Sequence, residues 1–346
     1  MTPGGAVFAL VAGVLLFLGS ADRAMAAPGP PADSADSIAM PTPLATRLAD
    51  GVWLIPGGIR PNRQPDGNTV MIEGPKGLIV FDTGRHPSQR LAIEAFAAAR
   101  RAPIVAIVNS HWHLDHVSGN PALKRDHPQA RVYASGAIDD ALTGFLARSA
   151  ADGRAYLKSA DVPAATREDI LADLATVEAG AALRPDVVIA ASRRLRLGGR
   201  AVTLNLAPNA ATAGDVWLFD GKSGVAVVGD LVTLPAAFLD TACPPGWKAG
   251  LDRIAATPFT LIVPGHGAPM TRAQFETYRR AFSALIDCAG SSRDAGACAA
   301  EWTEATGRLR DPGPAEAAMA RGMTRYYVAD VLRGTGGRGG DCRIPG

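Results

Sequence analysis

One six-residue segment, residues 111–116 with the sequence HWHLDH, constrains the fold and chemistry of this chain more than any other feature. The chain has six histidines, and three of them fall in this segment beside an aspartate. The segment follows residues 104–108, an apolar run that predicts a buried strand. A turn at a strand end can aim several side chains into one pocket, and imidazole and carboxylate groups are ligands that suit zinc. The predicted metal ligands in this segment are His111, His113, Asp115 and His116.

Three further polar residues stand at the ends of predicted strands. Asp230 ends the run Val-Val-Gly-Asp, and His266 lies in Pro-Gly-His-Gly directly after another apolar run. Asp82 has the same placement in Phe-Asp-Thr-Gly. We expect Asp230 and His266 to bind metal, and Asp82 to hold the histidine loop by hydrogen bonds instead. These contexts argue against the alternative that residues 111–116 form a solvated loop, because loops at strand ends are where sites of this kind are built.

Composition favours a globular protein that acts on a small molecule. At 346 residues, 47% of them apolar, the chain can bury a large core in one domain or two. Its 35 basic and 33 acidic residues give a formal charge of +2, and the sequence has no basic run or aromatic-interleaved basic stripe. The sequence therefore gives no reason to expect a nucleic-acid partner.

The N-terminus predicts export. Residues 6–18 form an apolar run that is shorter than the ~20 residues a membrane-spanning helix needs. Residues 24–26, Ala-Met-Ala, supply the small residues of a cleavage site, so residues 1–26 are predicted to be a signal peptide rather than an uncleaved anchor. Residues 27–47 are rich in Ala, Pro, Ser and Asp and are predicted to form a disordered linker. We expect a periplasmic or secreted protein with no membrane contact beyond the signal peptide.

An oxidising compartment permits disulfide bonds, which decides how the four cysteines are interpreted. Cys288 and Cys298 lie close in sequence and are the favoured pair. Cys243 and Cys342 then form the second bridge, one of three possible connectivities. One bridge with two free buried thiols is the alternative. The sequence has no Cys-x-x-Cys spacing, which disfavours a cysteine zinc site or a redox motif.

The apolar runs predict an α/β chain. Residues 52–55, 69–72 and 78–81 are short apolar or β-branched runs separated by Gly, Pro and Asn, and they predict consecutive strands. A helix is predicted over 87–101, before the strand at 104–108. Further strands are predicted at 187–189, 195–197, 202–206, 216–219, 225–228 and 260–263. These two groups of strands fit two sheets better than one.

Residues 138–182 lie between the two strand groups and repeat apolar residues at helical spacing, which predicts a helical insertion. The insertion would serve equally well as a cap over the substrate or as an extra packing layer. Helices are also predicted over 272–289 and 315–333. The Gly-rich end from Gly334 is expected to be flexible unless Cys342 ties it down.

Taken together, these segments resemble the metallo-β-lactamase superfamily, whose hallmark is His-x-His-x-Asp-His followed by spaced His, Asp and His ligands. The resemblance covers about residues 50–285, and the matching pieces are Asn68, residues 81–84, residues 111–116 with Gly119 and Asn120, residues 228–230 and residues 264–267. It implies an αββα sandwich over residues 48–285 that contains the helical insertion, with a C-terminal helical extension and tail over 286–346. It leaves the substrate open, because the family includes β-lactamases, thioesterases, lactonases, nucleases and oxidoreductase-type members.

The chain departs from the family at one ligand position. Members commonly carry His-Thr-x-Gly-Asp between the two halves, and its histidine completes the first metal site. Here residues 211–215 read Ala-Thr-Ala-Gly-Asp, so Ala211 stands where an imidazole would bind. His86 and Asn209 are weak candidates to replace it. The resemblance leaves His111 and His113 as the two ligands of the first site.

The second site keeps a full set of ligands by the same resemblance. Its members are Asp115, His116, Asp230 and His266. Catalytic zinc normally holds three protein ligands, so the sequence favours one tightly bound zinc ion over two. The incomplete first set also disfavours a redox di-iron site. His111 and His113 are left to hydrogen-bond substrate or to hold a weak second metal.

The expected reaction is hydrolysis of an ester, thioester, lactone or lactam. Zinc lowers the pKa of a bound water towards ~7 and polarises a carbonyl group, so that hydroxide can attack it. Asp115 or Asp230 would act as the catalytic carboxylate that orients the nucleophile or moves its proton. Trp112 is expected to be a packing wedge under the loop. The alternative is a degenerate, non-hydrolytic zinc-binding accessory protein, because the missing histidine could have removed catalysis.

The ligand count gives a first test. Purified and dialysed protein should retain about one equivalent of zinc by elemental analysis. Replacing Ala211 by histidine should raise that number, because it restores the family's missing ligand. Two tightly held equivalents in the unaltered protein would contradict the one-metal expectation.

Overall fold

The computed structural model describes residues 44–60, 62–310, 312–334 and 342. The expected signal peptide, most of the linker and most of the glycine-rich end lie outside these residues. The first strand, β1, begins at Thr46, two residues before the predicted start of the folded domain. Within the described ranges, no helix is long and apolar enough to cross a membrane.

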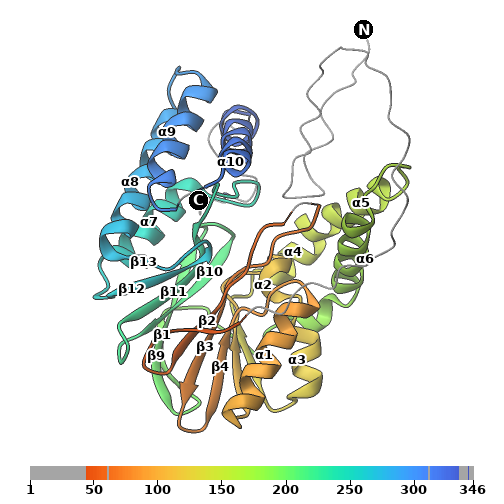
Figure 1. Cartoon of the computed structure of the whole chain (residues 1–346), viewed down its shortest axis with the longest axis vertical. Coiled ribbons are helices and arrows are strands. Elements are labelled where there is room, and N and C mark those ends of the chain that lie inside the picture. The colour runs from red at the N-terminus through yellow and green to blue at the C-terminus, as the bar shows by residue number, and fades with distance from the viewer. Residues whose placement is uncertain (1–43, 61, 311, 335–341, 343–346) are drawn as a thin grey trace.

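Two sheets form the centre of the molecule (Figure 1). The seven strands of the first sheet lie in sequence order: β1 (Thr46–Ala49), β2 (Val52–Ile55), β3 (Thr69–Gly74), β4 (Gly77–Phe81), β5 (Ile104–Val108), β6 (Arg131–Ala134) and β7 (Val187–Val188). The six strands of the second sheet lie in the order β13 (Met270–Thr271), β12 (Leu261–His266), β11 (Val225–Thr233), β10 (Gly214–Asp220), β9 (Arg200–Pro208) and β8 (Arg193–Leu197). Two sheets were predicted, and the structure confirms them.

Helices cover the outer face of each sheet, and two further groups of helices extend from the ends of the sandwich (Figure 1). In the first half they are α1 (Pro87–Arg100), α2 (Leu114–Val117), α3 (Asn120–Asp126), α4 (Ile138–Thr143), α5 (Phe145–Tyr156), α6 (Ala164–Glu178) and a 3-10 turn (Gly180–Leu183). In the second half they are α7 (Pro244–Ala255), α8 (Arg272–Ala289), α9 (Ala295–Gly307), α10 (Pro314–Tyr326) and a π-helical turn (Tyr327–Leu332). Helices α4 to α6 occupy the predicted insertion.

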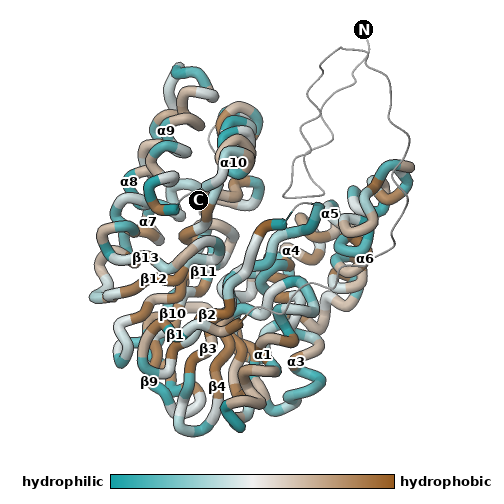
Figure 2. Tube along the Cα trace, viewed as in Figure 1, coloured by the Kyte–Doolittle hydropathy of each residue, from teal (hydrophilic) through white to brown (hydrophobic). Residues whose placement is uncertain are grey.

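Side chains that alternate between the two faces of a strand explain why each sheet is covered on both sides. In β3, Val70 and Ile72 pack between the two sheets, whereas Met71 packs under α1 with Ile93. Successive side chains of a strand point to opposite faces, so an entirely apolar strand must be covered on both sides. Figure 2 shows the apolar strands in the middle of the molecule. The αββα sandwich expected from the resemblance is therefore confirmed.

Helices α7 and α9 and strand β6 were not predicted. Helix α7 begins with Pro-Pro-Gly, residues that usually signal a turn, and it also contains Gly250. Proline is nevertheless tolerated in the first turn of a helix, where its missing N–H needs no partner. Trp247 and Leu251 of α7 are then buried against the second sheet, so that tertiary packing outweighs weak local propensity.

Both predicted disulfide bonds are present. Cys288 at the end of α8 is joined to Cys298 in α9, and Cys243 before α7 is joined to Cys342. The alternative with two free thiols is wrong for these four cysteines. The C-terminal helices also share the core of the second half, where the Trp302 indole N–H donates to the carbonyl of Pro235 at 2.9 Å.

The helical insertion is attached to the first half by ion pairs. In α6, Asp169 accepts a hydrogen bond from the backbone N–H of Gln64 at 2.8 Å and pairs with Arg63 at 2.5 Å. His86 lies between two carboxylates, with Nδ1 2.6 Å from Asp66 and Nε2 3.2 Å from Asp169. Both ring nitrogens of His86 therefore face aspartates of this attachment and not the predicted ligands.

This attachment predicts a pH-dependent stability. Burial lowers the pKa of His86, but its hydrogen bonds to Asp169 and Asp66 outweigh burial and raise it to about 9. The folded pKa exceeds the unfolded value of 6.5, so the stabilisation is complete below pH 6.5 and is lost as the pH rises through about 9. The unaltered protein should have a higher free energy of unfolding than a His86→Gln variant. This difference between the two proteins should be about 3 kcal/mol larger at pH 6 than at pH 10.

Urea denaturation at both pH values measures this difference. The matched control is His127→Gln, which removes a half-buried histidine paired with Glu94 at 2.9 Å, away from α6. A gap between the unaltered protein and His86→Gln that stays constant from pH 6 to pH 10 would show that folding does not raise the pKa of His86.

Candidate metal centre

Parallel strands bring the predicted ligands to one edge of the sandwich. Strands β4 and β5 are parallel, so the residues that follow them, Asp82 and His111, lie side by side. Strands β11 and β12 are also parallel and carry Asp230 and His266 to the same edge. Asp230 was predicted to end its strand, but β11 continues to Thr233. The edges of both sheets therefore contribute side chains to one centre.

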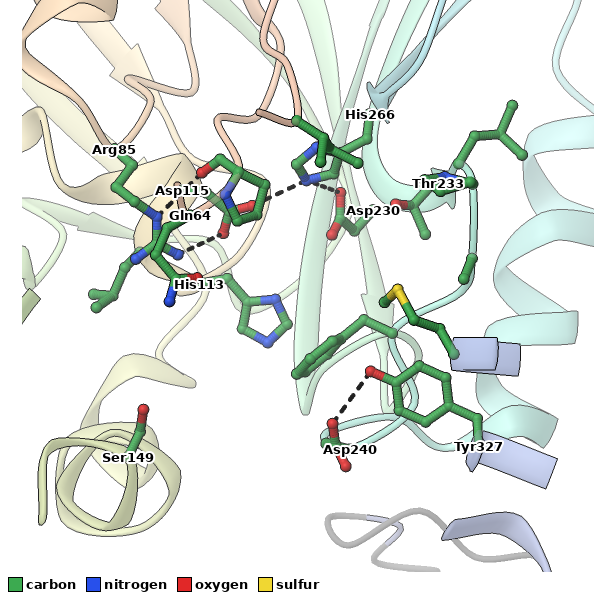
Figure 3. Close-up of a pocket in the computed structure, with 18 of the residues that line it drawn as sticks. Gln64, Arg85, His113, Asp115, Ser149, Asp230, Thr233, Asp240, His266 and Tyr327 are labelled. Atoms are coloured by element: carbon green, nitrogen blue, oxygen red, sulfur yellow. Dashed lines mark hydrogen bonds and ion pairs between the residues drawn. The ribbon is translucent and has the colours of Figure 1, made fainter. Parts of the chain in front are cut away.

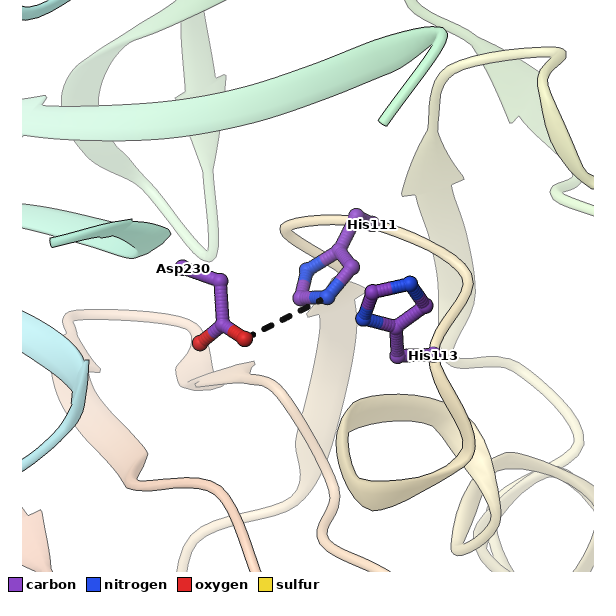
Figure 4. A group of neighbouring side chains, drawn as sticks. All are labelled: His111, His113 and Asp230. Carbon is purple, nitrogen blue, oxygen red and sulfur yellow. Dashed lines mark ion pairs between the residues drawn. The ribbon is translucent and has the colours of Figure 1, made fainter. Parts of the chain in front are cut away.

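The candidate ligands form two groups, within each of which the ligand atoms lie within 4.8 Å of one another. One group is His111, His113 and Asp230, and the other is Asp115, His116 and His266. Figure 4 shows the first group, in which Asp230 Oδ2 lies 3.8 Å from His111 Nε2. Asp230 Oδ1 lies 3.3 Å from His116 Nε2 and 3.6 Å from His266 Nε2. The sequence assigned Asp230 to the second group alone, whereas the structure places its carboxylate between the two.

Unsatisfied polar atoms show that the centre fits a metal ion. His111 Nε2, His116 Nε2 and Asp230 Oδ1 are buried and have no hydrogen-bond partner among the described residues. Buried polar atoms without a partner are rare in native proteins, and an ion is one of the few ways to satisfy them. The donors are imidazole nitrogens and carboxylate oxygens, which suit zinc.

Asp82 orients two of the histidines. Its Oδ2 accepts from His116 Nδ1 at 2.8 Å and from the Ser110 hydroxyl at 2.7 Å. Because the Ser110 hydroxyl donates to Asp82, it accepts from His111 Nδ1, which lies 2.8 Å away. His111 and His116 therefore carry a proton on Nδ1, so Nε2 is the nitrogen that each directs to the centre. This geometry corresponds to the hydrogen-bonding role expected of Asp82.

A threonine that the sequence analysis missed holds the third histidine. The Thr241 hydroxyl donates to the carbonyl oxygen of Ala211 at 3.0 Å and lies 3.1 Å from His113 Nε2. The hydroxyl has one hydrogen, so His113 Nε2 must donate to it, which leaves the lone pair of His113 on Nδ1. Nothing in the sequence signals this contact, because 128 residues separate the two side chains.

At neutral pH the electrostatics of the centre leave two histidines neutral and Asp115 ionised, while a third histidine keeps a proton. Burial lowers the pKa of His111 well below 6.5 and that of His113 to about 4, so both imidazoles are neutral. Burial opposes ionisation of Asp115, but the charge of His116 and the hydrogen bond from His266 hold its pKa well below the usual value. The pKa of His116 is raised, against burial, by the charges of Asp115 and Asp230. A metal ion must therefore displace a proton from His116, which makes its affinity increase with pH.

Two glycines allow the backbone to approach the ligands. A Cβ atom at Gly67 would lie 2.5 Å from the His116 ring, and one at Gly265 would overlap Asp230 Oδ1. Side chains at these positions would displace the ligands. Gly265 belongs to the Pro-Gly-His-Gly segment that the sequence analysis singled out, and its small size is what permits the close contact.

The centre opens onto a cavity of about 160 Å³ with mostly apolar walls (Figure 3). The candidate ligands His113, Asp115, Asp230 and His266 line one end. Many of the apolar lining residues come from the histidine loop, α5, the loop after β11, and α10, among them Trp112, Phe145, Leu146, Leu234, Phe238, Met319, Met323 and Tyr326. Trp112 packs against Phe145 as a wedge, with ring centroids 5.5 Å apart, and also lines the cavity. The insertion thus forms part of the cavity wall.

Arg85, a second residue that the sequence analysis missed, adds a positive charge beside the ligands. Its guanidinium pairs with Asp173 of α6 at 2.5 Å and lies 3.8 Å from Asp115 Oδ1. It also donates to the carbonyl of Pro65 at 3.1 Å. Arg85 lines the cavity and therefore connects the insertion, the ligands and the binding space.

A protein-family model described as the metallo-beta-lactamase superfamily matches residues 63–269. The chain belongs to this superfamily. This chain is 28% identical over 222 residues to the linear primary-alkylsulfatase of Pseudomonas sp. (strain ATCC 19151). The match covers 58% of this chain and 41% of that relative. The chain therefore spans less than half the length of that relative.

Solved structures show the same fold. The sec-alkylsulfatase Pisa1 from Pseudomonas sp. superposes with a TM-score of 0.58 at 19% identity, over 88% of this chain and 52% of the other. Metallo-beta-lactamases from Pontibacter korlensis and Hirschia baltica superpose with TM-scores of 0.50, at 18% and 19% identity. They cover 69% and 70% of this chain and 98% and 97% of their own. Part of this chain therefore lies outside the match with each of these two lactamases.

The Ser110 hydroxyl links Asp82 to His111, so its removal should weaken zinc binding. A Ser110→Ala variant loses the hydroxyl between Asp82 and His111, so zinc affinity in the group with His111, His113 and Asp230 should fall about 10- to 100-fold. Competition with a chromogenic zinc chelator measures this affinity.

Ser118→Ala is the matched control, because the buried Ser118 hydroxyl in the same region has no hydrogen-bond partner among the described residues. This variant should bind zinc as the unaltered protein does. Equal affinities in the Ser110 and Ser118 variants would show that the hydrogen bond to His111 does not affect metal binding.

Proposed function

We propose that the protein is an exported, zinc-dependent hydrolase that cleaves an ester-type bond in a small molecule with an apolar body. The observation that carries the proposal is the pair of ligand groups, joined by Asp230, at one end of an apolar cavity. Bound zinc would polarise the oxygen of the scissile group and lower the pKa of a coordinated water. Membership of the superfamily supports hydrolysis as the reaction class.

The two groups would differ in metal affinity. Asp115, His116 and His266 supply three donors, and Asp230 Oδ1 faces the same group. The other group reaches three donors only by sharing Asp230, since Ala211 offers no imidazole. We therefore propose one tightly held zinc ion in the group of Asp115 and a weaker site beside His111 and His113.

Asp115 and Asp230 are the proposed catalytic carboxylates. Burial would raise their pKa values, but neighbouring histidines hold them below the usual range, so both carboxylates are ionised at neutral pH. An ionised carboxylate can accept a hydrogen bond from the attacking water and can receive its proton. Asp115 and Asp230 both line the cavity, so each lies where it can contact a bound substrate.

Two classes of scissile bond are proposed. The first is an activated carbonyl, as in an ester, thioester, lactone or lactam. The second is a sulfate ester, which the likeness to a linear primary-alkylsulfatase favours. The cavity suits this second class, since it combines apolar walls for an aliphatic or aromatic body with the Arg85 guanidinium near the ligands for an anionic group.

Export is part of the proposal and is supported by the disulfide bonds. All four cysteines are paired, and such bonds persist in the periplasm or outside the cell, whereas cytosolic thiols are kept reduced. We propose a periplasmic or secreted location with a small molecule as the partner.

A substrate panel tests the function. Zinc-loaded protein should hydrolyse at least one of five classes: p-nitrophenyl esters, thioesters, lactones, a chromogenic β-lactam, or alkyl sulfates of increasing chain length. Chelation should abolish turnover and added zinc should restore it. A His116→Ala variant should lose more than about 100-fold in kcat/KM, since it removes a donor of the tight site.

His127→Ala is the control, because His127 lies outside both ligand groups. It should keep full activity. Tight zinc binding with no turnover on any class would contradict the hydrolase and would support the alternative of a non-hydrolytic zinc-binding accessory protein.

A further inference from the structure

The cavity has a second polar end, away from the ligands. Figure 3 shows Asp240 and Tyr327 on the opposite side of the cavity from His266 and Asp115. The Tyr327 hydroxyl donates to Asp240 Oδ2 at 3.3 Å. Asp240 lies in the loop after β11, and Tyr327 is the first residue of the π-helical turn that follows α10. Neither residue has a part in the proposed hydrolysis.

Asp240 is a carboxylate without a cation. Among the described residues, Tyr327 is its hydrogen-bonding partner, and no lysine, arginine or histidine forms an ion pair with it. Burial raises the pKa of Asp240 to about 6, so the group is mostly ionised at neutral pH. A partly buried charge with no opposite charge nearby is costly, and a bound cation would remove that cost.

Aromatic rings connect this carboxylate to the metal centre. The Phe238 ring lies 5.1 Å from the His113 ring and 6.0 Å from the Tyr327 ring, measured between centroids. Phe145 lies 6.2 Å from Phe238. Aromatic faces next to a carboxylate form a favourable environment for organic cations, and most of all for quaternary ammonium groups.

Part of this end of the cavity lies outside the residues that the family model matches. The family model matches residues 63–269, whereas Tyr327 and the lining residues of α10, Met319, Met323 and Tyr326, lie beyond it. Methionine side chains adapt to ligands of irregular shape. A π-helical turn such as the one at Tyr327 is rare and frequently occurs at functional sites.

We propose that Asp240, Tyr327 and Phe238 form a subsite for an organic cation, and that the substrate carries an amino or quaternary ammonium group at the end opposite its scissile bond. The assignment of a scissile bond to the other end of the substrate rests on the proposed hydrolase function. Binding of a cation at the subsite does not depend on that function. The apolar body of the substrate lies along the aromatic wall between the two polar ends.

A pair of ligands that differ only in charge tests the subsite. Choline and 3,3-dimethylbutanol have the same shape. Choline carries a positively charged nitrogen where 3,3-dimethylbutanol has an uncharged carbon atom. Ligand-observed NMR titrations of the zinc-loaded full chain at low ionic strength should show choline binding about tenfold more tightly. This preference corresponds to about 1.4 kcal/mol.

Asp240→Asn removes the charge and keeps an oxygen that can accept from Tyr327, so the local fold is retained. The preference for choline should disappear in this variant. Asp287→Asn, which removes an exposed carboxylate paired with Lys248 on another face, is the charge-matched control and should keep the preference. Equal affinities for both ligands in the unaltered protein, or a preference that survives Asp240→Asn, would overturn the proposal.

Hydrolysis provides a separate readout. For butyrylcholine and 3,3-dimethylbutyl butyrate, the ratio of kcat/KM should be about tenfold and should fall to about one in Asp240→Asn. If neither ester is cleaved but choline binds preferentially, the subsite stands and ester hydrolysis fails. If both esters are cleaved equally well, hydrolysis stands and the subsite is overturned.

Discussion

The buried carboxylate of Asp82 is the interaction on which the geometry of the centre depends. It is 1% exposed and accepts hydrogen bonds from the Ser110 backbone N–H, the Ser110 hydroxyl and His116 Nδ1. A buried charge must be paired or well hydrogen-bonded, so this one carboxylate fixes the start of the histidine loop and the tautomers of two ligands together. It stands at the end of β4 because parallel strands place their following loops side by side. The geometry of the candidate metal centre is thus a direct consequence of sheet topology and of one desolvated group.

Much of the fold and several members of the centre could be predicted because their signals are local. Apolar runs mark the strands, and histidines or aspartates directly after them indicate which side chains meet at the sheet edge. Contacts between distant residues left no such signal: Thr241 holds His113 across 128 positions, and Arg85 reaches Asp173 of the insertion across 88. That position 211 carries no imidazole was visible in the sequence. The position of Asp230 between both ligand groups was not, since it depends on how closely the two sheets approach.

Both added walls of the cavity are held by apolar packing, but they differ in the second kind of interaction that holds them. The insertion packs on the histidine loop in an apolar cluster, and it is also held through charged groups of α6, which include two aspartates that pair with Arg63, Arg85 and His86. The C-terminal extension is held by covalent bonds and by aromatic packing, with Trp302 buried in the core of the second half. Ion pairs respond to pH and salt, whereas disulfide bonds and apolar burial respond little to either. The two walls therefore differ in how their stability depends on the solution.

The bond between Cys243 and Cys342 closes a ring of 99 positions that contains α7, β12, α8, α9 and α10. His266 and Tyr327, at opposite ends of the cavity, both belong to this ring. Ring closure removes open conformations of the chain in which α10 would stand far from β12. In a reducing compartment the disulfide bond would be broken, and the ring would open. The bridge thus couples the two ends of the cavity: it favours the arrangement in which the segment that carries Tyr327 stays beside the strand that carries His266.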